Sequence, residues 1–191
     1  PPMRLADPRV APLEDSELEG EAKAQLEVMR DHKGEVGNIF RTLARHPKLM
    51  KRWLVFGNHI LSKSTLDPRE REIAILRVGY RCRSIYEWTQ HVRIGKATGL
   101  SDEEIRWIGE GPDAAGWSDF DAALLRASDE LHDDAMLSDS SWKALTERYS
   151  TEQMMDFIFT VGQYHTVSMA LNSLGVQNEN GDTPFPDGGT L

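Results

Sequence analysis

Apolar residues recur along most of this chain at intervals of three and four positions, which is the spacing of one face of an α-helix. The clearest examples are the apolar positions 120, 124, 127 and 131 and the long apolar segment 151–175. Helix-start signals accompany the pattern, such as Ser101 followed three residues later by Glu104. Convincing two-residue alternation, which indicates a strand, does not appear. The sequence therefore predicts an all-α protein.

The proline, glycine and helix-capping residues between the apolar segments predict the organisation of the chain. The first fifteen residues contain four prolines and predict an extended arm, 1–15. Ser16 and Glu19 form a capping-box pattern, which predicts that the helical domain 16–177 begins here. After it, the polar stretch 178–191, rich in Gly and Pro, predicts a flexible tail. Within the domain we expect helical segments at about 16–29, 39–43, 47–61, 68–80, 84–98, 101–110, 118–131, 138–149 and 151–175.

Composition narrows the possible partners of this single domain. The chain has 191 residues and a net charge of −9, and no basic stripe interrupts this acidity, so we expect neither nucleic-acid nor membrane-surface binding. No apolar run reaches the length of a spanning helix, and we predict a soluble, cytoplasmic protein. The one cysteine, Cys82, excludes an internal disulfide framework, a thiolate zinc cluster and a CxxC pair.

Candidate chemistry begins with a glutamate on the apolar face of a predicted helix. Glu72 shares its face with Ile75 and Leu76, whereas Arg69, Glu70 and Arg71 belong to the wet start of the helix. Burial disfavours a charged carboxylate, so Glu72 either needs a hydrogen-bonding partner or becomes suited to proton transfer. The structural alternative is a glutamate paired with an arginine such as Arg69 or Arg77.

The next helix aligns three polar side chains. Ser84, Glu87 and His91 lie at i, i+3 and i+7, which stacks a hydroxyl, a carboxylate and an imidazole along one face. Glu87 and His91 then form an acid–base couple, in which the carboxylate orients the ring and the ring moves a proton. The alternatives are an ordinary exposed Glu–His pair and, less favoured by the pattern, a two-ligand metal site. Further along, we interpret Glu130, His132, Asp133 and Asp134 as a helix-end network rather than a metal cluster.

The spacing Glu72-x11-Ser84-x2-Glu87-x3-His91 resembles the E-x11-C-x2-C-x3-H signature of the carboxymuconolactone decarboxylase and alkylhydroperoxidase D-like superfamily. Ser84 and Glu87 stand where the peroxidase branch has its two cysteines. The resemblance covers roughly residues 38–178. It also rests on the segments Ser64-Thr65-Leu66, Gly99-Leu100-Ser101, Glu130-Leu131-His132-Asp133-Asp134, Val161-Gly162-Gln163-Tyr164-His165 and Asn172-Ser173-Leu174-Gly175-Val176-Gln177.

The resemblance implies an alkylhydroperoxidase D-like helical fold, and the departure from it indicates the branch. Disulfide-based peroxide reduction needs an attacking thiolate and a resolving thiol, and Ser84 and Glu87 supply neither. Cys82 lies two residues from the first aligned position, on another helix face. The glutamate–histidine combination instead resembles the decarboxylase branch, whose members are cofactor-free lyases acting on a carboxylated butenolide in aromatic-ring catabolism. We therefore expect no cofactor and no metal.

Roles follow from this resemblance. We assign His91 as the general acid/base, Glu87 as its orienter or alternate proton carrier, and Glu72 as a relay behind them. Ser84 is the expected hydrogen-bond donor to a small-molecule substrate. Further binding candidates, each of which has a core packing role as its alternative, are His59, Trp88, Tyr164 and His165.

The reaction and the assembly stay open at this stage. A related isomerase or cyclase acting on another carbonyl compound, and a non-catalytic ligand-binding protein, are the alternatives to a lyase. Small helical members of this family form symmetric homo-oligomers, so we expect a homo-oligomer, a trimer or a hexamer.

Overall fold

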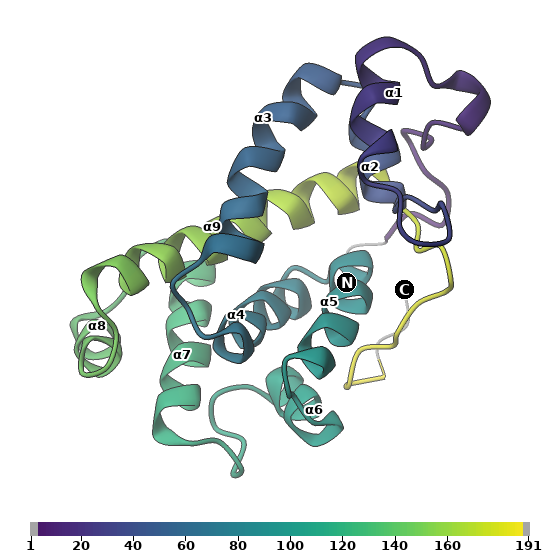
Figure 1. The fold of residues 1–191 in the computed structure, drawn as a ribbon. Coiled ribbons are helices and arrows are strands. Elements are labelled where there is room, and N and C mark those ends of the chain that lie inside the picture. The colour runs from purple at the N-terminus through teal and green to yellow at the C-terminus, as the bar shows by residue number, and fades with distance from the viewer. Residues whose placement is uncertain (1–3, 189–191) are drawn as a thin grey trace.

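The computed structural model describes residues 4–188, which form nine α-helices and no strand, so the predicted all-α class is confirmed (Figure 1). A 3-10 turn, Asp15–Glu17, precedes the first helix, and a π-helical turn, His59–Lys63, follows the third. The helices are α1 (Gly20–Glu27), α2 (Asn38–Leu43), α3 (Pro47–Asn58), α4 (Pro68–Arg81), α5 (Ile85–Ala97), α6 (Asp102–Glu110), α7 (Asp119–Asp133), α8 (Asp139–Thr146) and α9 (Thr151–Leu174).

Helix α4 lies at the centre of the fold and contacts α5, α6, α7 and α9. Its start follows the local sequence: the Asp67 carboxylate accepts hydrogen bonds from the backbone of the first turn, and Pro68 occupies the first helical position. Every residue from Glu70 to Gly79 is buried. The prediction that the start of this helix is exposed to solvent was wrong, because Glu70 and Arg71 are only 6% and 8% exposed. Glu70 is instead paired with Arg148 and accepts a hydrogen bond from the Tyr149 hydroxyl.

Helix α9 is the longest element, and α3 crosses it while α1 and α2 lie near its C-terminal end (Figure 1). Ser150 and Gln153 form a capping box at its start, which is the predicted residue 151. Gly175 ends the helix with φ of +73°, and a Cβ atom there would lie 2.9 Å from the carbonyl oxygen of Asp7. A glycine is therefore required where the N-terminal segment passes the end of α9.

The described parts of the two terminal segments pack on the helical body. Backbone N–H groups of Arg9 and Val10 donate to the Leu174 carbonyl at the end of α9. The C-terminal segment runs past α5, where Phe185 is buried. The predicted arm and tail also include 1–3 and 189–191, which lie outside the described residues. Within 4–188, no helix combines the length and apolar character needed to cross a membrane.

The first helix begins later than the capping-box pattern at Ser16 predicts. Ser16 lies inside the 3-10 turn, where the Glu17 carboxylate accepts a hydrogen bond from the Glu14 backbone N–H. Gly20, with φ of +52°, then separates this turn from the body of α1. The predicted box was wrong, because Glu14 and Glu17, two residues earlier in the chain, make the reciprocal bonds.

Candidate active site

The site consists of a buried chain of charged side chains between α4 and α5. His91 Nδ1 lies 2.6 Å from Glu72 Oε2, and His91 Nε2 lies 2.9 Å from Glu87 Oε1. The three side chains are at most 6% exposed. The i,i+4 spacing places Glu87 beside His91 on α5, while the packing of α4 against α5 brings Glu72 to the other ring nitrogen. Both nitrogens of one imidazole thus contact carboxylates.

Arg71 extends the chain on the side of Glu72. Its guanidinium donates to Glu72 Oε1 at 3.2 Å and to the Leu61 carbonyl at 2.9 Å. Leu61 belongs to the π-helical turn, whose irregular backbone leaves a carbonyl free for this contact. The arginine alternative for Glu72 is therefore realised, but by Arg71 rather than by the two expected arginines. Arg69 pairs with Glu104 and Asp121, and Arg77 pairs with Asp129.

The two carboxylates determine the protonation of His91. Burial alone opposes a charged ring, but the negative charges of Glu72 and Glu87 and their hydrogen bonds outweigh it and raise the pKa of His91 to about 10. At neutral pH the ring is therefore an imidazolium. The two positive charges, on Arg71 and His91, then balance the two negative charges, on Glu72 and Glu87. This balance makes burial of the charged groups energetically tolerable.

Ser84 lies at the start of the same helix, as its N-cap residue. Its side chain is fully buried, and its Oγ atom has no hydrogen-bond partner within the chain. A buried hydroxyl without a partner costs free energy, so this donor is available for a ligand group that reaches it. Tyr164 of α9 contacts the His91 ring edge-on, with 4.9 Å between the ring centroids. Burial, followed by the charges of Glu87 and Glu72, raises the pKa of the Tyr164 phenol well above its usual value.

Three predicted binding residues lie elsewhere. The His59 ring is partly exposed and bonds Asp156 at 2.7 Å. Trp88 is 1% exposed in a hydrophobic cluster, where its indole N–H donates to the Pro184 carbonyl. His165 bonds His132 at 2.8 Å. Their predicted contact with substrate is tested by none of these observations and stays a prediction.

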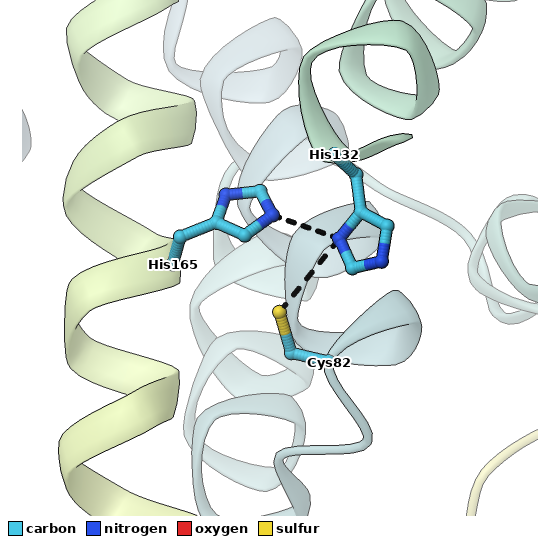
Figure 2. A group of neighbouring side chains, drawn as sticks. All are labelled: Cys82, His132 and His165. Atoms are coloured by element: carbon cyan, nitrogen blue, oxygen red, sulfur yellow. Dashed lines mark hydrogen bonds between the residues drawn. The ribbon is translucent and has the colours of Figure 1, made fainter. Parts of the chain in front are cut away.

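The residue set expected to form a helix-end network divides in two. Glu130 accepts hydrogen bonds from Ser138 and Ser141, and Asp133 pairs with Arg81, as in a structural network. His132, by contrast, turns toward Cys82 and His165 (Figure 2). Sequence reasoning missed this three-residue cluster, because its members are 50 and 33 residues apart and share no local pattern.

One apolar hollow of the described surface is lined by residues other than those of the acid–base chain. It lies between α3 and α9, and its lining includes Leu49, Trp53 and Val167. None of Glu72, Ser84, Glu87 and His91 lines it. The side chains of Glu72, Glu87 and His91 are instead covered by other parts of the single chain, with at most 6% of each exposed.

Fold and site together define a class: an all-helical protein that holds an imidazolium between two buried carboxylates, with an unpartnered hydroxyl nearby. Comparison with known proteins finds a similar family for one segment of the chain. Residues 47–129 match the carboxymuconolactone decarboxylase family, and this segment contains Glu72, Ser84, Glu87 and His91. The segment that carries the site is therefore similar to the carboxymuconolactone decarboxylase family. A search of curated proteins finds no match.

Solved structures share the fold over nearly the whole chain. An AhpD-core, peroxidase-related protein from Ralstonia eutropha superposes with a TM-score of 0.79 at 16% identity, covering 91% of this chain and 93% of that one. The debrominase Bmp8 in complex with 2,3,4-tribromopyrrole gives 0.75 at 15% identity, with 92% and 94% covered. A peroxidase-related protein from Silicibacter sp. TM1040 gives 0.73 at 16% identity, with 94% and 93% covered. The predicted AhpD-like fold is thereby confirmed.

Proposed function

We propose that this protein is a cofactor-independent carbon–carbon lyase that acts by proton transfer on a carboxylated lactone or a similar activated carbonyl compound. The observation that carries the proposal is the buried chain in which the His91 ring contacts Glu72 at 2.6 Å and Glu87 at 2.9 Å. The match to the carboxymuconolactone decarboxylase family over 47–129 supports it, because this segment contains these three residues.

The proposed reaction needs no external electron acceptor. When the bond to the departing CO2 breaks, its electron pair moves into the conjugated carbonyl of the substrate, which becomes an enolate. A proton must then reach carbon, and the enolate collapses to the product. The protonated His91 supplies that proton from Nε2, either directly or through Glu87, which already contacts this nitrogen. Glu72 holds Nδ1 and stabilises the charged ring.

Two further residues receive roles in this proposal. Ser84 donates its unpartnered buried hydroxyl to the substrate carboxylate or to the enolate oxygen. Tyr164 packs against His91 and is only 5% exposed, so it must shift when substrate enters. A site that opens for substrate and closes again also excludes water, which strengthens the electrostatic stabilisation of the enolate.

A different acid–base reaction uses the same residues. An isomerase or cyclase would move a proton to and from carbon without loss of CO2, and a non-catalytic protein would bind without turnover. The similar structures described as peroxidase-related or as a debrominase make redox chemistry a further alternative. Against two-thiol peroxide reduction stands the single cysteine of the sequence. Burial, partly offset by Ser168, Arg4 and Arg81, also raises the pKa of the Cys82 thiol, which disfavours the reactive thiolate.

One experiment separates these reactions. The protein is incubated in D2O with a panel of carboxylated butenolides and keto acids, and CO2 release and deuterium incorporation at carbon are both measured. The lyase gives CO2 and one deuterium per product, whereas an isomerase gives deuterium without CO2. Thermal stabilisation by a ligand without either product indicates a binding protein. No turnover on any carboxylated substrate contradicts the proposal.

Matched variants then connect turnover to the site. We expect His91→Gln and Glu87→Gln to lower kcat at least about a hundredfold, which is the contribution of a positioned general acid. Glu147→Gln, on the exposed end of α8, is the control for a lost carboxylate and retains wild-type turnover. Circular dichroism and oligomeric state are compared for all three. Full turnover in both site variants contradicts the assignment even if the protein is a lyase.

A further inference from the structure

The second chemical feature of the molecule is the cluster formed by Cys82, His132 and His165. Their ligand atoms all lie within 4.8 Å of one another, although the residues come from the ends of α4 and α7 and from the middle of α9. Figure 2 shows the thiol and the two rings directed at one another. We propose that these three side chains form a zinc-binding site with one thiolate, two imidazole nitrogens and an open fourth position.

The ligand atoms already stand close to the geometry that zinc requires. His132 Nδ1 lies 2.8 Å from His165 Nε2, and Cys82 Sγ lies 3.9 Å from His132 Nδ1. Tetrahedral bonds of ~2.0–2.1 Å to nitrogen and ~2.3 Å to sulfur place two nitrogens ~3.3 Å apart and a nitrogen ~3.6 Å from sulfur. The two rings therefore separate by about half an ångström, and the sulfur moves slightly closer to His132. The sulfur and His165 Nε2, which lie within 4.8 Å of one another, approach to ~3.6 Å.

The hydrogen bonds around His165 prepare it as a ligand. Its Nδ1 contacts the Val161 carbonyl at 2.8 Å, and because a carbonyl only accepts, this nitrogen carries the proton. The neutral ring then presents the Nε2 lone pair to the cluster, where it accepts a hydrogen bond from His132 Nδ1. When zinc takes the place of that proton, the proton passes through solvent to His132 Nε2, so the ring stays neutral and binds zinc through the Nδ1 lone pair. A ring held by a backbone carbonyl at its second nitrogen is the usual arrangement of a metal-bound histidine.

The cysteine is likewise held in position. Cys82 is the C-cap residue of α4, and its carbonyl accepts hydrogen bonds from Arg4 and Asn172 at 2.7 and 3.0 Å. The Ser168 hydroxyl, fully buried on α9 beside the sulfur, has no other hydrogen-bond partner and is available to donate to a zinc-bound thiolate. Zinc binding removes the thiol proton to solvent, which burial otherwise disfavours, so occupancy increases with pH.

The charges around the cluster are compatible with a bound cation. Arg81 faces both Cys82 and His132 and opposes a positive ion, but Asp129 and Asp133 hold its guanidinium at 2.8 and 2.7 Å. The same aspartates attract a cation toward the His132 ring.

The test uses the full chain, stripped with EDTA and kept reduced with a phosphine. Zinc binding is measured by competition with a chromophoric chelator, and cobalt is used as a spectroscopic probe. We expect one zinc per chain and, with cobalt, a thiolate charge-transfer band together with the intense visible bands of tetrahedral coordination. Less than half an equivalent of zinc, or cobalt binding without the thiolate band, overturns the proposal.

Variants assign the ligands. Cys82→Ser and His165→Asn each lower zinc affinity at least about tenfold and, with Cys82→Ser, the cobalt thiolate band is lost. His132→Asn provides a third variant at a partly exposed position, should either of the others fail to fold. His32→Asn removes an exposed histidine and is the matched control, with unchanged affinity. Wild-type zinc affinity in the folded Cys82 or histidine-cluster variants overturns the site.

Discussion

Replacing Glu72 with glutamine tests whether the buried charges at the site balance one another. The substitution removes one negative charge and keeps the shape of a side chain that is fully buried between Arg71 and His91. In the native protein the two cations face two carboxylates, Glu72 and Glu87. In Glu72→Gln one positive charge is left in excess, and the ring loses the partner at Nδ1.

The contact distances set the size of the effect. At an effective dielectric constant of ~20, the attraction of Glu72 is ~5 kcal/mol to Arg71 over 3.2 Å and ~6 kcal/mol to His91 over 2.6 Å. Desolvation of the carboxylate and its repulsion from Glu87 cancel much of this sum. Loss of one partner from a buried pair typically costs ~3–5 kcal/mol. We expect this decrease in the free energy of unfolding at pH 7.

The assay is urea unfolding of Glu72→Gln and of the wild type, together with NMR titration of the His91 ring. The pKa of His91, raised to about 10 in the native protein, falls in the variant because one of the two carboxylates that hold its proton is gone. Glu147→Gln is the exposed control and changes stability by less than ~0.5 kcal/mol. A loss below ~1 kcal/mol in Glu72→Gln, or an unchanged His91 titration, refutes the charge balance.

Three further predictions address the ring, the hydroxyl and the assembly. Because the pKa of His91 is raised from 6.5 to about 10, the contribution of the ring to stability is complete below pH 6.5 and is lost as the pH rises toward 10. The difference in unfolding free energy between wild type and His91→Gln therefore shrinks across this window, and a constant difference contradicts the prediction. Ser84→Ala removes a buried hydroxyl without a partner, so denaturant unfolding shows stability unchanged or raised by ~1 kcal/mol while kcat falls; unchanged kcat contradicts a substrate contact. Met155 and Phe159 are 57% and 55% exposed on α9, and Phe159→Glu dissociates the expected homo-oligomer in sedimentation runs; a monomeric wild type contradicts that expectation.

The helices were largely predictable because their start and stop signals are local. Ser101 with Glu104 forms the capping box that its spacing indicates, and Gly175 ends α9. The wet start predicted for α4 was wrong for a reason that lies outside the helix. Four other helices surround α4, so the positions of Glu70 and Arg71 face protein rather than water. Helical periodicity identifies an apolar face, but it does not show whether the polar face is covered too.

The site was predictable to the extent that its residues share one helix. The Glu87–His91 contact follows from i,i+4 spacing, and the observed burial removes the alternative of an exposed pair. The Glu72–His91 contact joins two helices, so helical periodicity could not predict it. Its prediction rested on the family resemblance. Arg71 was missed because its second hydrogen bond goes to a carbonyl of a π-helical turn, which has no residue-type signal.

The two chemical sites share the segments that position them. On α9, Tyr164 packs against His91 and the next residue, His165, bonds His132, because successive helical residues point about 100° apart. Between α4 and α5, Cys82 and Ser84 flank Arg83, whose φ of +49° turns the chain from one helix into the next. A variant of His165 can therefore alter turnover by moving Tyr164, without any contact to substrate. Zinc affinity distinguishes the two roles of His165: loss of a zinc ligand lowers zinc affinity, whereas loss of a residue that contacts only substrate changes KM and leaves zinc affinity unchanged.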